Sequence, residues 1–145
     1  MSLQDWARDG WLRRHEPSRQ ETAELLAVAD RDLADSRVPG LSPDARFSLA
    51  YSAGLQAGMA ALGAAGYRAG HQSHHFYVIQ SLAYTIRADA RMVEQFDAFR
   101  KKRNVAGYER VGAVSDREAA DMTQLAQGLR RRVEQWLRAE HPDLL

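Results

Sequence analysis

Apolar residues recur at spacings of three and four along most of the chain, which is the pattern of helices that bury one face. The clearest example runs from Met122 to Leu137 and ends before Pro142. No stretch has the alternating pattern of a half-buried strand. The sequence therefore predicts an all-α fold, an antiparallel bundle of four main helices, with residues 1–17 as an additional short helix or ordered arm.

Start and stop signals predict where these helices lie. Three starts have a serine N-cap followed by a favourable residue, namely Ser18 with Glu21, Ser42 with Pro43, and Ser115 with Glu118. The helix after Ser42 contains Gly54 and Gly58, and we interpret them as the place where another helix approaches closely, which makes this helix central. Residues 66–70 are expected to form a turn. A third helical region follows and is split near Asp89. Its first part continues through Phe76, Ile79 and Leu82 to Ile86. Its second part opens at Asp89 and ends at Gly107 or Tyr108, or continues to Arg110.

Composition narrows the class of protein. The 145 residues fit one domain, residues 1–145, with 45% hydrophobic and 27% charged residues, as in soluble globular proteins. The net charge is +1, so any attraction to phosphate must come from local clustering. There is no cysteine, which excludes disulfides and thiolate-ligated zinc. There is also no apolar leader and no membrane span, so we expect a cytoplasmic protein without membrane contacts. We expect no metal and no cofactor.

Two groups of conspicuous residues have structural interpretations. Trp6 and Trp11 have large apolar rings, which we expect to pack on the domain or on a partner chain. The run of three arginines, Arg130–Arg132, lies on the last predicted helix. We interpret this run as a solvated face near a helix end.

The helix that opens at Asp89 carries an arginine on its apolar face. Its apolar positions follow steps of four and three, at Met92, Phe96 and Phe99. The next position of the same stripe is Arg103. Because burial of an unpartnered guanidinium would cost several kcal/mol, we expect Arg103 at a seam between helices. There it would bind a carboxylate, a polar cleft or an anionic ligand.

Basic residues cluster around Arg103. Five of the residues 96–110 are basic and two are acidic, so this stretch can attract phosphate groups or form a solvated surface. The other basic side chains are Arg100, Lys101, Lys102 and Arg110. Asn104 and Tyr108 share a helix face, whereas Arg103 and Tyr108 diverge by about 140° on an ideal helix. They converge only if the helix loosens near Gly107 or if two copies meet across a two-fold axis.

Three histidines, His71, His74 and His75, surround Ser73 at the start of the segment before this helix. Their spacing would group them on one face, which is one arrangement for a metal site. No carboxylate lies nearby in the sequence, so a polar helix N-terminus with neutral imidazoles is an alternative. A third interpretation is that one histidine reaches the cleft of Arg103 as an accessory group.

The stretch from Phe99 to Glu109, within its helical surroundings, resembles the HEPN superfamily. In that family an arginine, commonly followed by a polar residue such as asparagine, precedes a histidine by four to six residues near the end of a bundle helix. Here Arg103 and Asn104 match the first part, and Tyr108 stands in the position of the histidine. The likeness in helix order extends over roughly residues 18–142.

This resemblance implies a homodimer in which two such helices meet. It implies a metal-independent ribonuclease cleft, or the toxin half of a toxin–antitoxin pair, often beside a nucleotidyltransferase partner. In such a cleft Arg103 would hold the scissile phosphate and stabilise its developing charge, and Asn104 would orient it. If the nucleotidyltransferase exists, Tyr108 is a candidate acceptor for nucleotide transfer.

Tyr108 decides between the functional hypotheses. A phenol with a pKa of about 10 is a poorer general base at neutral pH than an imidazole with a pKa of about 6.5. We therefore expect a HEPN-like dimeric module that associates with nucleic acid or nucleotides and is non-catalytic or weakly active. In a purely structural version, Arg103 pairs with Asp97, Glu109 or a partner's carboxylate. The alternative is a metal-independent ribonuclease that uses Arg103, Asn104 and Tyr108 at the dimer cleft.

Overall fold

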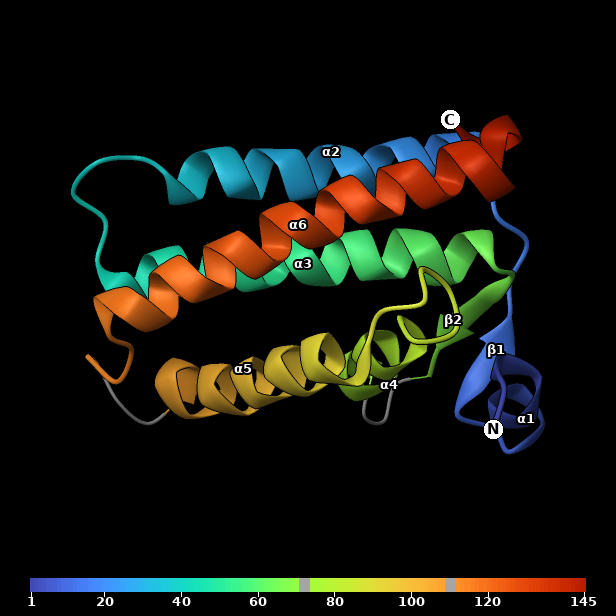
Figure 1. Cartoon of the computed structure of the whole chain (residues 1–145), viewed down its shortest axis with the longest axis horizontal. Helices are drawn as coiled ribbons and strands as arrows, with labels where there is room; N and C mark the ends of the chain where they lie inside the picture. The colour runs from blue at the N-terminus through green and yellow to red at the C-terminus, as the bar shows by residue number, and fades with distance from the viewer. Residues whose placement is uncertain (71–73, 109–111) are drawn as a thin grey trace.

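The structure, a computed structural model, is mostly helical (Figure 1). It describes residues 1–70, 74–108 and 112–145, and for residues 105–108 the backbone alone. Within these ranges the elements, in chain order, are α1 (Leu3–Arg8), β1 (Leu12–Arg14), α2 (Arg19–Ser36), α3 (Pro43–Ala64), β2 (Tyr67–Ala69), α4 (His74–Ser81), α5 (Ala90–Tyr108), α6 (Asp116–Glu140) and a 3-10 turn, η1 (Pro142–Leu144).

The four long helices, α2, α3, α5 and α6, alternate in direction, as the colour gradient of Figure 1 shows. Helix α3 is central, because it makes extensive contacts with α2 and α6 and also contacts α4 and α5. Most of α3 is buried, which suits its alanine-rich and glycine-rich sequence. The predicted all-helical class and the central position of this helix are confirmed. No helix of the described ranges is long and apolar enough to cross a lipid bilayer.

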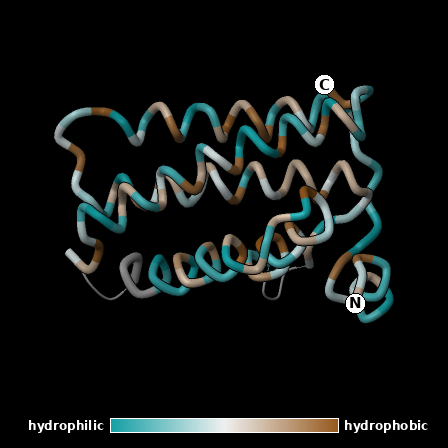
Figure 2. Tube along the Cα trace, in the orientation of Figure 1, coloured by the Kyte–Doolittle hydropathy of each residue, from teal (hydrophilic) through white to brown (hydrophobic). Residues whose placement is uncertain are grey.

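Helix α6 buries one stripe against α3. Brown and teal alternate along α6 in Figure 2, as expected for a helix with one apolar face. The buried positions follow the predicted helical spacing, with Met122, Leu125, Leu129, Val133 and Leu137 among them. Full burial of each such side chain contributes about 1.5–3 kcal/mol to stability.

Serine caps start three of the long helices, as predicted. The side chains of Ser18, Ser42 and Ser115 accept hydrogen bonds from the backbone N–H three residues later, at 3.0–3.1 Å. At Ser115 the side chain of Glu118 also accepts a hydrogen bond from the serine N–H at 3.0 Å, which completes the capping box. These bonds satisfy N–H groups that the first turn of a helix leaves unpaired.

Gly54 and Gly58 allow α4 and α5 to lie close to α3. A Cβ atom on Gly54 would lie 3.1 Å from Cζ of Phe96 on α5. A Cβ atom on Gly58 would lie 3.0 Å from Cγ1 of Val78 on α4. The predicted helix–helix approach at these two glycines is therefore confirmed.

The N-terminal arm and the predicted turn at residues 66–70 form a small sheet, so the prediction that the chain has no strand was wrong. Residues 1–17 contain α1 and β1, and β1 pairs with β2 in antiparallel fashion. Leu12 lies opposite Ala69, and both are buried. Strands of three residues are too short for alternation to be visible in the sequence.

The N-terminal tryptophans cover α4. The Trp6 ring meets the Tyr77 and Tyr84 rings edge to face, at centroid distances of 5.4 and 5.2 Å. Trp11 instead stacks on Tyr77 at 5.2 Å, and remains 41% exposed. The expectation that the tryptophans pack on the domain is confirmed for Trp6 and holds for only one face of Trp11.

Helix α4 ends at Ser81, whereas the sequence predicted a helix that continued to Ile86. The hydroxyl of Ser81 donates to the carbonyl of Val78 at 2.6 Å, which competes with helix continuation. The following turn still buries Leu82 and Ile86, because the chain remains folded over the same core. Helical spacing alone could not distinguish this buried turn from another helical turn.

The arginine run on α6 is not simply solvated, so that interpretation was wrong. Arg130 binds Asp30 on α2 through Nε at 2.9 Å and binds Glu134 through Nη1 at 3.0 Å. Arg132 donates from Nη2 to the carbonyl of Ile86 at 3.1 Å. The two side chains therefore connect α6 with α2 and with the segment between α4 and α5.

Candidate functional site

Arg103 continues the buried face of α5, as the helical spacing predicts. Phe96 and Phe99 on this face are buried, and Arg103 is half-buried. The Cζ atom of its guanidinium lies 5.2 Å from the centroid of the Tyr51 ring on α3. The aromatic face attracts the cation and still leaves the N–H groups at the guanidinium edge able to donate to a ligand.

Tyr51 connects three elements of the fold. Its ring meets Phe96 of α5 edge to face, with 5.6 Å between centroids. Its hydroxyl lies 3.1 Å from Nδ1 of His75 on α4, within hydrogen-bond distance. Arg103, Tyr51 and His75, here called the arginine–tyrosine–histidine cluster, therefore meet where α3, α4 and α5 come together.

Burial raises the pKa of Tyr51 to about 12, although the positive charges of Arg103 and Arg100 oppose part of this rise. The phenol is therefore protonated at neutral pH. It can donate its proton to Nδ1 of His75, and the neutral imidazole then carries its own proton on Nε2. In that tautomer His75 presents a second hydrogen-bond donor beside the guanidinium.

Burial also lowers the pKa of His75, and the charge of Arg103 lowers it further, with smaller contributions from His74 and Arg100. The ordinary value is 6.5, so the imidazole is neutral at pH 7. An anion bound beside Arg103 would counteract the charge effect and favour the imidazolium. Binding of an anion and protonation of His75 are therefore coupled.

The other predicted phosphate-binding residues of α5 are engaged by carboxylates. Arg100 donates from Nε to Asp97 at 2.7 Å, and its guanidinium lies over the Phe76 ring at 5.5 Å. Lys101 lies 3.7 Å from the same Asp97. Lys102 lies 3.4 Å from Glu118 of α6. The basic cluster is therefore partly neutralised.

Arg103 differs from these neighbours, because no carboxylate among the residues described here forms an ion pair with it. Asp97, one of the partners that the sequence suggested, is bound by Arg100 and Lys101 instead. Glu109 and Arg110, and the side chain of Tyr108, lie outside the described residues. Asn104 is described, and its side chain is exposed next to Arg103 on α5.

Of the histidines singled out in the sequence, His75 belongs to the cluster and His74 lies beside it. His74 contacts the His75 ring edge to face, with 5.7 Å between centroids. His71 lies outside the described residues. In the parts of the chain for which coordinates are described, no group of three or more histidine, aspartate or glutamate side chains could hold a metal ion.

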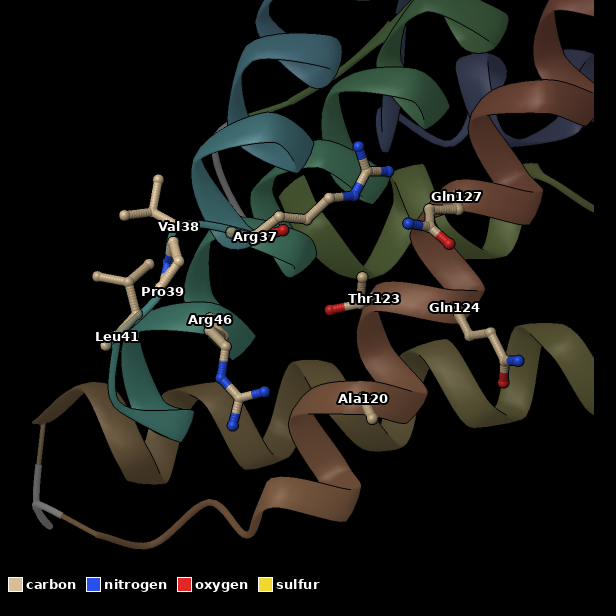
Figure 3. Close-up of a pocket in the computed structure, with 11 residues that line it drawn as sticks. Arg37, Val38, Pro39, Leu41, Arg46, Ala120, Thr123, Gln124 and Gln127 are labelled. Atoms are coloured by element: carbon tan, nitrogen blue, oxygen red, sulfur yellow. The ribbon is translucent and has the colours of Figure 1, made fainter.

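A separate cavity of about 620 Å³ lies between the α2–α3 loop and α6 and involves none of the cluster residues. Figure 3 shows its polar lining, in which Arg37 and Arg46 lie across from Thr123, Gln124 and Gln127 of α6. Arg46 is engaged by Asp116 through Nη2, while its buried Nε has no hydrogen-bond partner. One of the two arginines in this cavity is therefore neutralised.

Sequence reasoning did not identify Tyr51 as a site residue. Its spacing of four residues from Phe47 is typical of a buried apolar position on the central helix, and its ring packs in the core. The signal that could have identified it is a hydroxyl on a buried helix face, since a buried phenol usually has a hydrogen-bond partner. The spacing of the three histidines does not distinguish His75 from His71 and His74 as the one that reaches the cleft of Arg103.

No family model matches the chain, and no curated protein and no solved structure is significantly similar to it.

Proposed function

We propose that this protein is a HEPN-like module that binds phosphate groups of RNA or nucleotides at the arginine–tyrosine–histidine cluster. The observation that carries the proposal is the half-buried guanidinium of Arg103, which lies on the Tyr51 ring without a carboxylate partner among the described residues. A charge in such a place is costly unless an anion compensates it. A guanidinium fork suits a phosphate, which it can bind with two parallel hydrogen bonds.

The cluster would bind phosphate with two kinds of donor. Arg103 supplies charge-assisted hydrogen bonds, and Nε2 of His75 supplies a neutral donor in the tautomer that accepts from Tyr51. Both groups are partly removed from water, which strengthens their interaction with an anion. The ordinary role of this module would be binding, with little or no catalysis.

The HEPN resemblance adds a homodimer to the proposal. In it, two α5 helices meet across a two-fold axis and the exposed Asn104 of each faces the shared groove. The protein would act in the cytoplasm in a toxin–antitoxin type system with a nucleotidyltransferase partner. Tyr108 would be the acceptor of nucleotide transfer. An unchanged intact mass after co-expression with that partner, with Tyr108→Phe as the control, would contradict this role.

A metal-independent ribonuclease is the second candidate, and the position of His75 favours it. The imidazole is neutral and close to the cation, so it can supply the base that Tyr108 does not. For this role Nδ1–H must donate to the Tyr51 oxygen, which leaves Nε2 free to accept the proton of a ribose 2′-hydroxyl. The 2′-oxygen would then bond to phosphorus as the bond from phosphorus to the 5′-oxygen breaks. The leaving 5′-oxygen would take a proton from water, and a 2′,3′-cyclic phosphate would remain.

Direct binding of RNA by the full-length protein tests the first proposal. We expect Arg103→Ala to weaken binding of a labelled oligoribonucleotide about tenfold or more, because a charge-assisted contact is lost. Arg103→Lys should retain only part of the affinity, because an ammonium cannot form the fork. Arg91→Ala is the matched control, since Arg91 is an exposed arginine near the other end of α5. Equal affinity of wild type and Arg103→Ala would refute the proposal.

Cleavage separates the two candidates. The ribonuclease would produce cyclic phosphate ends in the presence of EDTA and would lose this activity in His75→Ala. It would also slow growth on overexpression, and Arg103→Ala would relieve this toxicity. A binding module would leave the RNA intact and would not affect growth.

A further inference from the structure

The two-stranded sheet, whose strand β2 contacts α4, carries an unneutralised pair of like charges. The register places Arg13 of β1 directly opposite Arg68 of β2. Both are exposed, because the neighbouring positions Leu12 and Ala69 face the core. Like charges directly opposite each other destabilise a strand pair. Across the described part of the chain, neither arginine forms an ion pair.

An exposed aromatic ring adjoins this pair. Trp11 precedes β1 and stacks on Tyr77 of α4, with 5.2 Å between ring centroids and 19° between ring planes. Its backbone is held in place, since the Trp11 N–H donates to the carbonyl of Trp6 at 2.9 Å and the Trp11 carbonyl accepts from the N–H of Gly70 at 3.2 Å. Trp11 is nevertheless 41% exposed. The indole is therefore fixed and still accessible to a ligand.

A row of ring contacts leads from Trp11 towards the arginine–tyrosine–histidine cluster. The Tyr77 ring meets the Phe76 ring at 5.2 Å, and the Arg100 guanidinium lies over Phe76 at 5.5 Å. The next residue before Phe76 is His75, which belongs to the cluster. Helix α4 thus connects the two regions, and Figure 1 shows it between the β1–β2 sheet and α5.

We infer that the β1–β2 sheet and Trp11 form a second contact for single-stranded RNA. An unpaired base would stack on Trp11, and the adjoining phosphate would lie between Arg13 and Arg68 and remove their repulsion. Stacking on a protein ring requires an unstacked base, which a duplex does not offer. This inference depends on the proposed RNA binding and specifies the class of RNA.

Charge argues for a nucleic acid as the ligand of this surface. A second copy of the same surface would bring arginines against arginines, and no acidic side chain of the described chain pairs with Arg13 or Arg68. A polyanion with flat bases complements both the charges and the ring. A surface that only paired with another copy would not need two opposed cations.

The test measures anisotropy of a labelled oligouridylate with full-length protein. We expect Trp11→Ala to weaken binding about tenfold and Trp11→Phe to retain most of the affinity, because phenylalanine preserves a stacking surface. The double substitution Arg13→Gln and Arg68→Gln should reduce the slope of log K against log salt by about 0.7 per arginine. Arg117→Gln, an 87% exposed side chain at the start of α6, is the matched control and should leave that slope unchanged.

The outcomes separate this inference from the proposed function. If the surface variants bind as well as wild type while Arg103→Ala binds weakly, the second contact is wrong and the cluster remains. If the surface variants lose affinity and Arg103→Ala does not, the second contact stands and the cluster is wrong. Equal affinity for duplex and single-stranded RNA, or an indole emission of Trp11 that depends on protein concentration without RNA, would overturn the inference. If Trp11→Ala does not fold, the double substitution of Arg13 and Arg68 still tests the inference.

Discussion

The Arg103 guanidinium lies over the ring of Tyr51, with 5.2 Å between Cζ and the ring centroid. A cation–π contact of this kind is worth about 0.5–2 kcal/mol, and more as water is excluded. The hydroxyl of the same tyrosine is 3.1 Å from Nδ1 of His75. One side chain of the central helix therefore orients both groups of the proposed phosphate site.

Substitution at Tyr51 separates the ring from the hydroxyl. Tyr51→Phe keeps the aromatic face under Arg103 and removes only the hydroxyl that orients His75. We therefore expect a small loss of RNA affinity and a loss of about 1 kcal/mol in the free energy of unfolding. Tyr51→Leu removes both contacts, so RNA affinity should also fall. Urea unfolding and anisotropy measure these effects. The ring has no role in orienting Arg103 if the two variants bind RNA equally well.

His75 should make stability depend on pH. Its pKa is lowered in the folded protein and is about 6.5 in the unfolded chain, so between these values the unfolded state binds more protons. The stabilisation is complete above about pH 6.5 and is lost as the pH falls through the folded value. Over this pH window the free energy of unfolding, measured in urea, should therefore fall more for wild type than for His75→Gln. Parallel pH profiles for the two proteins would contradict this prediction.

Anion binding should depend on pH in the opposite sense. A bound phosphate favours the imidazolium, so RNA binding by wild type should tighten between pH 7.5 and 5.5 relative to His75→Gln. NMR titration of the His75 ring with inorganic phosphate should show its pKa rising. A pKa that phosphate leaves unchanged would place the anion away from His75.

The glycines of α3 should respond to alanine in opposite ways. A Cβ atom would lie 3.1 Å from Phe96 at Gly54 and 3.0 Å from Val78 at Gly58, whereas nothing lies within 4 Å at Gly63. Alanine at either of the first two should lower the free energy of unfolding by about 1–2 kcal/mol, because overpacking exceeds the gain in helix propensity. Gly63→Ala should raise it by about 0.5–1 kcal/mol. Urea unfolding of the three variants gives the comparison.

Arg130 should matter more for stability than an exposed arginine on the same helix. It joins α6 to Asp30 of α2 through two hydrogen bonds, of 2.9 and 3.1 Å, and its side chain is only 17% exposed. We expect Arg130→Met to cost about 1 kcal/mol, less at high salt. Arg117→Met, at an 87% exposed side chain, should cost less than about 0.5 kcal/mol. A salt-independent or equal loss in both variants would show that the ion pair to α2 contributes nothing.

Local rules predicted most of the helical fold. Serine caps marked the helix starts, Gly54 and Gly58 marked the close approach, and the spacing of Phe96, Phe99 and Arg103 placed the arginine on a buried face. Each of these signals depends only on residues of one helix. They could therefore be read from the sequence without knowledge of the other elements.

Contacts between distant segments could not be predicted in this way. The partner of Arg103 is Tyr51 on another helix, and no local spacing relates the two. The pairing of β1 with β2 likewise depends on how the N-terminal arm returns to the end of α3. The homodimer, the RNA ligand and the role of Tyr108 stay predictions.

The bare backbone at Gly54 determines how far α5 stands from α3, and thereby how far the guanidinium of Arg103 can reach. A larger residue at this position would push Phe96 outward and move the Arg103 guanidinium away from the Tyr51 ring. A larger residue at this position should therefore weaken ligand binding and lower stability together, so glycine there serves both properties.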